Sequence, residues 1–192
     1  MAGAAMRRRS AHKPASSLAR PGNAIMEPRS HPTPPAALDG PEALLLSRLL
    51  WAASHDRNER AIAAGRLQLV TALATGVLAY EPRAHALRPL SDLDLRVPRK
   101  PPEPRQGFDL IYVATATRCE AATRRVVAAV DSATVAVRVE RLCAAYGLWL
   151  SPRGPLDARA FEAGLALERP RFVSFAQSIG WTDECRPDTF KA

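Results

Sequence analysis

The spacing of hydrophobic residues changes several times along the chain, and each change predicts a new helix or strand. From Pro41 the apolar residues recur at helical spacing and predict a helix that ends near His55-Asp56. Two short apolar runs, 69–74 and 77–80, flank Thr75-Gly76 and predict a β-hairpin. The helix is expected to bury a face formed by Leu45, Leu46, Leu49, Leu50 and Ala53.

The second half of the chain begins after a charged, proline-containing loop over residues 96–106. The continuous apolar run from Phe108 to Ala114 predicts a buried strand near the centre of a sheet. The segment from Cys119 to Ala145 is rich in Ala, Val and Arg and contains no Gly or Pro, so it predicts one or two core helices. Gly147 follows as a suitable C-cap.

The last segments predict a short strand at 148–150, a helix at 157–165 with Asp157 as its N-cap, and a strand at 171–179. This mixture of helices and strands indicates an α+β fold. No internal repeat is present in the sequence.

The first 40 residues differ from the rest in composition. Seven of the 17 prolines lie between Pro14 and Pro41, and residues 1–26 carry five basic side chains and no acidic one. Such a segment has too little apolar surface to offset the entropy of ordering. We therefore expect residues 1–40 to form a basic, partly disordered segment, followed by one domain over residues 41–192.

Charge and cysteine content narrow the function classes. The 27 Lys and Arg against 19 Asp and Glu give a net charge of +8, which suits an anionic partner such as a nucleic acid, an acidic surface or a phosphorylated cofactor. No run approaches the roughly 18 apolar residues of a membrane-spanning helix. No apolar segment of a secretory signal follows the basic start. Three cysteines and four histidines without metal-ligand spacing predict no metal centre and a reducing, cytoplasmic setting.

Four regions of the sequence carry motifs of one known family, in the same order and at nearly the same separations. They are LLWAA at 49–53, GVLAYEPRAH at 76–85, DSA at 131–133 with CAAYGL at 143–148, and the turn Arg153-Gly154 followed by AQSIGW at 176–181. Together they resemble the FMN-dependent nitroreductase family, in particular its short branch of nitroreductases and SagB-like dehydrogenases. The resemblance covers roughly residues 27–182.

This resemblance implies a fold and an activity. The expected fold is a central, mostly antiparallel sheet flanked by helices, built as an intertwined homodimer with FMN at the subunit interface. The expected activity is that of an NAD(P)H-dependent oxidoreductase, which passes a hydride through the flavin to a small organic acceptor. In such proteins the flavin ring performs the hydride chemistry, and the protein supplies binding, orientation and electrostatics.

The resemblance also proposes cofactor-binding residues. A flavin carries a phosphate, and its ring gains negative charge at the N1–C2 carbonyl region on reduction, so arginines and backbone N–H donors are the groups expected to bind it. Arg29 and Ser30 stand where the family places its phosphate motif, ahead of the first helix. Arg153-Gly154 stands where the family's turn offers a backbone N–H to the flavin N5 edge. Arg138, on the long predicted helix, is a further candidate for the phosphate or the ring carbonyls. No catalytic side chain is assigned.

Two alternative functions follow from other features of the sequence. The stretch 61–66 and the positions Ala133 and Val137 lack the polar residues that contact the flavin ring in the family. One alternative is therefore a non-catalytic nitroreductase-fold protein that acts as a binding or partner subunit. The second alternative, a basic nucleic-acid-binding protein, follows from the charge of +8, although the sequence lacks the interleaved aromatic residues that single-strand binders use.

Overall fold

The computed structural model describes residues 41–54, 60–98, 106–116 and 121–181, and every structural statement below concerns these residues. The predicted division at residue 40 lies outside them and stays a prediction. None of the described helices is long and apolar enough to cross a membrane. The elements are α1 (Pro41–Ser54), α2 (Arg60–Ala63), β1 (Leu67–Leu73), β2 (Gly76–Glu81), β3 (Ala86–Ser91), β4 (Gln106–Thr115), α3 (Ala121–Ala145), β5 (Trp149–Pro152), α4 (Pro155–Gly164) and β6 (Arg171–Trp181).

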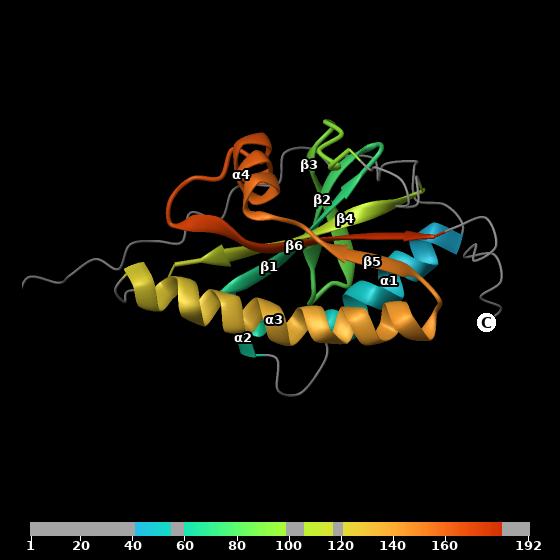
Figure 1. Cartoon of the computed structure of the whole chain (residues 1–192), viewed down its shortest axis with the longest axis horizontal. Coiled ribbons are helices and arrows are strands. Elements are labelled where there is room, and N and C mark those ends of the chain that lie inside the picture. The colour runs from blue at the N-terminus through green and yellow to red at the C-terminus, as the bar shows by residue number, and fades with distance from the viewer. Residues whose placement is uncertain (1–40, 55–59, 99–105, 117–120, 182–192) are drawn as a thin grey trace, which may run out of the picture. The chain divides into compact units, whose positions relative to one another are not determined.

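The strands form one antiparallel sheet in the order β3-β2-β1-β4-β6-β5 (Figure 1). β4 lies between β1 and β6, with Val70 opposite Ile111 and Asp109 opposite Ser178. All of its residues from Phe108 to Ala114 are buried. The apolar run in the sequence therefore predicted its central place correctly, because only a strand covered on both faces buries every side chain.

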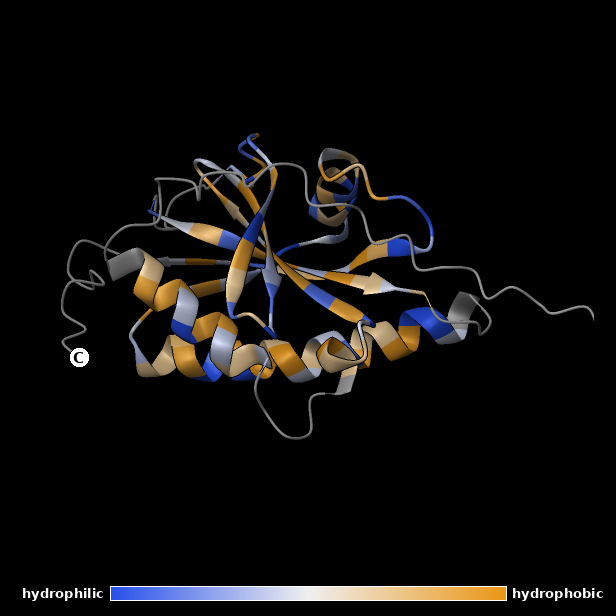
Figure 2. Ribbon diagram, turned by 180° about the vertical axis from the view of Figure 1, so that it is seen from behind, coloured by the Kyte–Doolittle hydropathy of each residue, from blue (hydrophilic) through white to orange (hydrophobic). Residues whose placement is uncertain are grey.

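Helices cover both faces of the sheet, so the core has two halves. α1, α2 and α3 pack on one face, against alternate residues of β4 such as Leu110 and Tyr112. α4 packs on the other face, where Phe161 contacts the cluster that includes Ile111 and Val113. Figure 2 shows the hydrophobic stretches of the strands that lie between these layers. The predicted α+β class and helix-flanked antiparallel sheet are confirmed.

α1 attaches to the sheet through the predicted leucine face. Leu45, Leu46, Leu49 and Leu50 are all buried, whereas Trp51 on the other side is exposed. Burial of one such side chain contributes about 1.5–3 kcal/mol. The helix is therefore held mainly by this stripe rather than by its intrinsic propensity.

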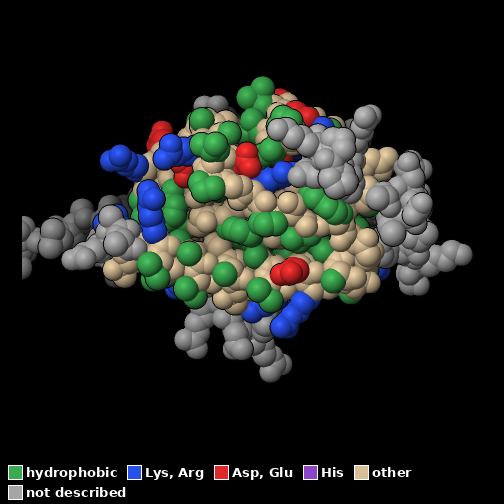
Figure 3. All heavy atoms as spheres, viewed as in Figure 1, with side chains coloured by type: hydrophobic (Ala, Val, Ile, Leu, Met, Phe, Trp, Pro, Cys, Tyr) green, Lys and Arg blue, Asp and Glu red, His purple; other side chains and the backbone are tan. Residues whose placement is uncertain are grey.

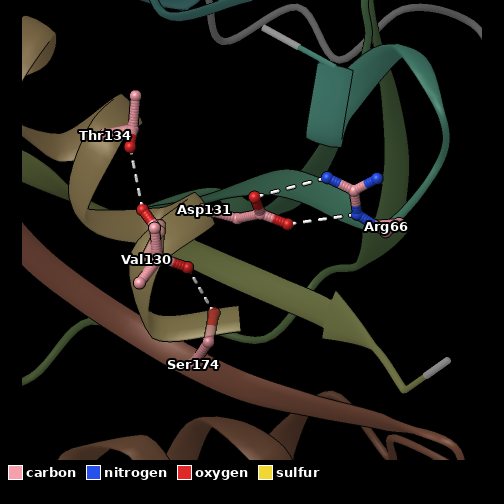
Figure 4. A network of polar contacts seen from close by, with 6 residues as sticks. Arg66, Val130, Asp131, Thr134 and Ser174 are labelled. Atoms are coloured by element: carbon pink, nitrogen blue, oxygen red, sulfur yellow. Dashed lines mark hydrogen bonds and ion pairs between the residues drawn. The ribbon is translucent and has the colours of Figure 1, made fainter. Parts of the chain in front are cut away.

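α3 is a single helix, and its end and its middle are both fixed by hydrogen bonds. At its C-terminus the N–H of Leu148 donates to the carbonyl of Cys143 at 2.8 Å, and Gly147 has φ +64°. This is a Schellman motif, and it confirms the helix end that the position of Gly147 predicted. In the middle, Arg66 donates to the carboxylate of Asp131 at 3.2 and 3.3 Å, which ties the helix to the start of β1 (Figure 4).

Two elements and one cap differ from the sequence expectation. β3 was not predicted, because its exposed and half-buried residues, including Arg88 and Pro89, lack the apolar signal of a strand. Proline is tolerated there because β3 is an edge strand.

The short helix α2 was also missed. α4 begins two residues earlier than expected, with Gly154 at the N-cap and Pro155 as its first residue, a position that proline favours. Asp157 caps it from within the first turn, since its carboxylate accepts from the N–H of Gly154.

Cys143 is buried on the inner side of α3, and this makes its reactivity predictable. Burial, with a smaller contribution from Glu140, raises the pKa of its thiol from 9.0 to about 12. The thiolate is the reactive form. We expect Cys143 to resist alkylation at pH 8 in the folded protein and to react once urea unfolds it. Mass spectrometry of a variant with Cys119→Ser and Cys185→Ser isolates this thiol; alkylation of the folded protein at the rate of a free cysteine would contradict the burial.

The same shift predicts a pH dependence of stability. Between the unfolded value of about 9 and the folded value of about 12, the folded state holds a proton that the unfolded state releases. The contribution of Cys143 is thus constant below pH 9 and is lost as the pH rises above it. Urea titrations at pH 8 and pH 10 should show a steeper loss of unfolding free energy in the native sequence than in Cys143→Ala.

Candidate functional site

The main candidate site is a cavity of about 500 Å³ that lies along the first half of β6, between α3 and α4. Its cationic side chains are Arg125 from α3, Arg153 from the turn before α4, and Arg159 from α4. Among the described residues that line it, Glu162 is the only acidic one. Its other lining residues are Ala129, Gly154, Pro155, Ala158, Phe172, Val173, Ser174, Phe175 and Ala176. The described lining is therefore mostly apolar and carries three positive charges against one negative charge.

This cavity exists because β5 is shorter than β6. β5 pairs only with residues 177–180, and among the described residues no strand covers positions 171–176 on the side away from β4. Two groups that do not belong to a paired strand form hydrogen bonds with the backbone of this uncovered part of β6. The N–H of Val173 donates to the carboxylate of Glu162 at 2.8 Å, and the carbonyl of Ala176 accepts from the N–H of Arg153 at 2.8 Å.

The side chain of Arg153 is fixed by a polar chain that runs into the sheet. Its Nε donates to the hydroxyl of Ser178 at 2.5 Å, and that hydroxyl donates to the carboxylate of Asp109. The second carboxylate oxygen accepts from the N–H of Val97 at 2.7 Å. Asp109 and Ser178 are fully buried. A buried carboxylate therefore anchors, through one hydroxyl, the arginine at the cavity rim.

The charge of Asp109 also acts on Arg96, which lies in the loop after β3. The pKa of the Arg96 guanidinium is raised, first by its hydrogen bond to Asp94 and to a smaller extent by the charges of Asp94 and Asp109. The same contact lowers the pKa of the Asp94 carboxyl. Asp109 is thus approached by cationic residues from two loops, Arg96 and Arg153.

Gly154 leaves the turn open toward the cavity. Its φ of −77° and ψ of 173° are extended values that any residue can adopt. A Cβ atom built at this position would meet no other atom within 4 Å. Its N–H donates to Asp157 at 3.2 Å in an exposed setting, whereas the N–H of Arg153 is used inside the sheet. Gly154 is therefore the backbone donor of this turn that a ligand can approach.

The structure brings together part of the predicted site. Arg153 and Gly154 both line the cavity. Arg138 lies on α3, half-buried, and is not among the residues that line this cavity. Arg29 and Ser30 lie outside the described residues. Sequence reasoning missed Asp109, whose signal was present: it is the only charged residue in an otherwise apolar run.

A second polar cluster joins α1 to the turn between β2 and β3. His85 contacts the hydroxyl of Ser47 through Nε2 at 2.8 Å and that of Tyr80 through Nδ1 at 2.7 Å. The hydroxyl of Ser54 donates to Tyr80 at 3.2 Å. The ring of Trp51 lies edge-on to His85, with centroids 4.9 Å apart. Burial raises the pKa of Tyr80. The tyrosine and histidine of the segment 76–85 thus hold the hairpin against α1, which is a structural role.

Known structures share this arrangement of sheet and helices. One is a crystal structure from Ralstonia eutropha of a protein provisionally named a nitroreductase, which matches with a TM-score of 0.58 and 25% identity over 71% of each chain. The chain has a nitroreductase-like fold. The recognition of this family from the sequence is therefore confirmed at the level of the fold.

A second solved structure is the Escherichia coli microcin synthetase complex McbBCD with truncated pro-MccB17 bound. A chain of it matches this nitroreductase-fold protein with a TM-score of 0.59 and 14% identity, over 73% of this chain and 64% of that one. At this identity the likeness concerns the fold alone. No protein-family model and no curated protein sequence matches the chain. Among the described residues, no group of three His, Cys, Asp or Glu side chains could hold a metal ion.

Proposed function

We propose that this nitroreductase-fold protein is a cytoplasmic FMN-dependent oxidoreductase that transfers a hydride from NAD(P)H to a small organic acceptor. The observation that carries the proposal is the position of Arg153-Gly154. This turn, which the sequence resemblance assigns to the flavin, borders a cavity of about 500 Å³ in a protein with a nitroreductase-like fold. Cavities of roughly 300–1,000 Å³ are typical of cofactor sites.

The residues present fit the chemistry of FMN. Arg125, Arg153 and Arg159 offer positive charge to a phosphate or to the ring carbonyls, and Phe172 and Phe175 offer apolar surface to a planar ring. The open space at Gly154 leaves room for close approach. Bound FMN would supply the hydride chemistry, which no side chain of the chain can perform.

The residues of the chain would bind the flavin and orient it. The hydrogen bond to Ser178 holds the Arg153 guanidinium in one place at the cavity rim. The N–H of Gly154 would donate to the ring edge in exchange for its exposed bond to Asp157. Arg29 and Ser30 are proposed for the phosphate, with Arg138 as a further candidate.

A homodimer fits an unpartnered stripe on α3. Val126, Val130 and Val137 are 63%, 61% and 44% exposed and, with Ala133 between them, follow each other at spacings of four, three and four residues. This is the spacing with which two helices pack along a common seam. The same helix contributes Arg125 and Ala129 to the cavity. A second copy seated on the stripe would thus lie beside the proposed flavin.

The visible absorption of the purified protein, before and after incubation with FMN and desalting, tests the proposal. We expect retained flavin bands and acceptor-dependent oxidation of NAD(P)H. Arg153→Ala should weaken FMN binding by about tenfold or more, since it removes a charged hydrogen-bond donor. Arg88→Ala, at the opposite edge of the sheet and paired only at the surface, should leave binding unchanged. A colourless protein that does not bind added FMN would favour the non-catalytic partner subunit instead.

A further inference from the structure

A second cavity, of about 530 Å³, adjoins the first where α3 and β6 begin. Four arginines line it, Arg124 and Arg125 from α3 and Arg169 and Arg171 from the start of β6 and the loop before it. Its other lining residues are Glu162, Ala116, Leu167, Pro170 and Phe172. Basic side chains gather at this end of the molecule in Figure 3. We refer to it as the arginine cavity.

Among the described residues, the lining of the arginine cavity carries more positive than negative charge, with four arginines against one glutamate. Arg125 and Arg169 form no ion pair with any described residue. Arg171 donates at 2.6 Å to Gln68, whose side chain is neutral. Glu162, the acidic residue of the described lining, keeps its negative charge while it accepts from the N–H of Val173, and it offsets one of the four positive charges.

The placement of Arg125, Arg169 and Arg171 opposes local stability. Arg125 lies near the N-terminus of α3, where the helix dipole is positive and no acidic residue stands in the first turn. Arg169 and Arg171 come from a segment more than 40 positions further along the chain, so the fold gathers like charges around one hollow. Like charges around one cavity repel each other. An anion bound in the cavity would offset both the unfavourable interaction with the helix dipole and the repulsion between the arginines.

We propose that the arginine cavity binds the diphosphate group of a nucleotide. A guanidinium group can donate two parallel hydrogen bonds to two oxygens of a phosphate. Several guanidinium groups around one cavity therefore suit a ligand with adjacent phosphates. Phe172, Pro170 and Leu167 give the same cavity an apolar wall against which a base or ribose can pack. A monophosphate alone would use only part of this lining.

The natural source of this diphosphate is the pyridine nucleotide donor, and this part of the inference rests on the proposed function. The arginine cavity and the proposed flavin cavity share Arg125, Glu162 and Phe172. A dinucleotide with its diphosphate among the arginines would therefore extend its second base toward the first cavity. Binding of a diphosphate by the arginines does not itself require a flavin.

Titration calorimetry of the flavin-free, 192-residue protein with ADP tests the inference. We expect ADP to bind, AMP to bind at least about tenfold more weakly, and Arg169→Gln or Arg125→Gln each to weaken ADP binding by about tenfold or more. Arg88→Gln is the matched control and should leave the affinity unchanged, because Arg88 is an exposed arginine on the opposite edge strand. Far-ultraviolet circular dichroism verifies that the variants fold.

Two further experiments, a competition titration and steady-state kinetics, distinguish the possible sources of the diphosphate. Competition of NADH or NADPH against ADP identifies the dinucleotide as the source, whereas ADP binding without such competition identifies a free nucleoside diphosphate. In flavin-loaded protein, Arg169→Gln should raise the KM for NAD(P)H and leave kcat unchanged. Absence of ADP binding at low salt, equal binding by the variants, or binding of a DNA duplex but not of ADP would overturn the inference. ADP binding in a protein that takes up no FMN would overturn the proposed function alone.

Discussion

Asp109→Ala is expected to lower the free energy of unfolding by about 3–5 kcal/mol, the range found when one partner of a buried charged network is removed. The carboxylate is fully buried and accepts from the hydroxyl of Ser178 and the N–H of Val97. Alanine would leave both donors without an acceptor in a place that water does not reach, and each such donor costs about 1–3 kcal/mol. Urea denaturation followed by circular dichroism measures the loss.

Two comparisons sharpen this experiment. Asp109→Asn keeps an oxygen acceptor of similar size, so it should cost less than Asp109→Ala. Asp92→Ala removes an exposed carboxylate from the neighbouring loop and should change the stability by less than about 0.5 kcal/mol. If Asp109→Ala were no more destabilising than Asp92→Ala, the buried network would not contribute to the fold.

The same network links stability to the candidate site. Ser178 joins Asp109 to the guanidinium of Arg153, so removal of the carboxylate should free that side chain to move at the cavity rim. We therefore expect Asp109→Asn, which still folds, to weaken FMN binding as well. Asp109 acts here as a positioning residue, because it does not line the cavity itself and is linked to it through Ser178 and Arg153.

The sequence predicted the elements whose burial produces a regular pattern. The leucine face of α1 follows from burial on one side of the helix. The run of β4, apolar except for Asp109, follows from burial on both faces of the strand. Gly147 marked the end of α3 because a positive φ is needed there. β3 escaped prediction because an exposed edge strand buries too little to leave a pattern.

The candidate site was predictable only in part, for a physical reason. Arg153-Gly154 could be found because its residues are adjacent in the sequence. The first cavity, in contrast, arises from the mismatch in length between β5 and β6, and the strand pairing that creates it is long-range. Arg125 and Arg169 meet only after that pairing forms. Single-sequence patterns describe local burial and carry no record of which distant segments come together.

Phe161 is the residue on which the attachment of α4 depends. It is 1% exposed and is the only buried residue of this helix. Its ring packs into the cluster formed by β1, β2, β4 and β6, which includes Val113 and Val173. Phe161→Ala is expected to lower the free energy of unfolding by about 3–5 kcal/mol, because the ring is lost and a cavity remains.

This substitution should also act locally. α4 follows directly on Arg153-Gly154 and carries Glu162, so a helix that no longer docks would release the turn and the bond to Val173. Hydrogen exchange should show faster exchange in α4 than in α3, which is held independently by Asp131 and the Schellman motif.

The control is on the same helix. Leu156 is 79% exposed, so Leu156→Ala should change the stability by less than about 0.5 kcal/mol and leave the exchange of α4 unaltered. Phe161→Leu retains most of the apolar volume and should fall between the two. Equal stability of Phe161→Ala and Leu156→Ala in urea would mean that the attachment of α4 does not depend on this ring. Another contact would then have to hold the turn Arg153-Gly154 in place.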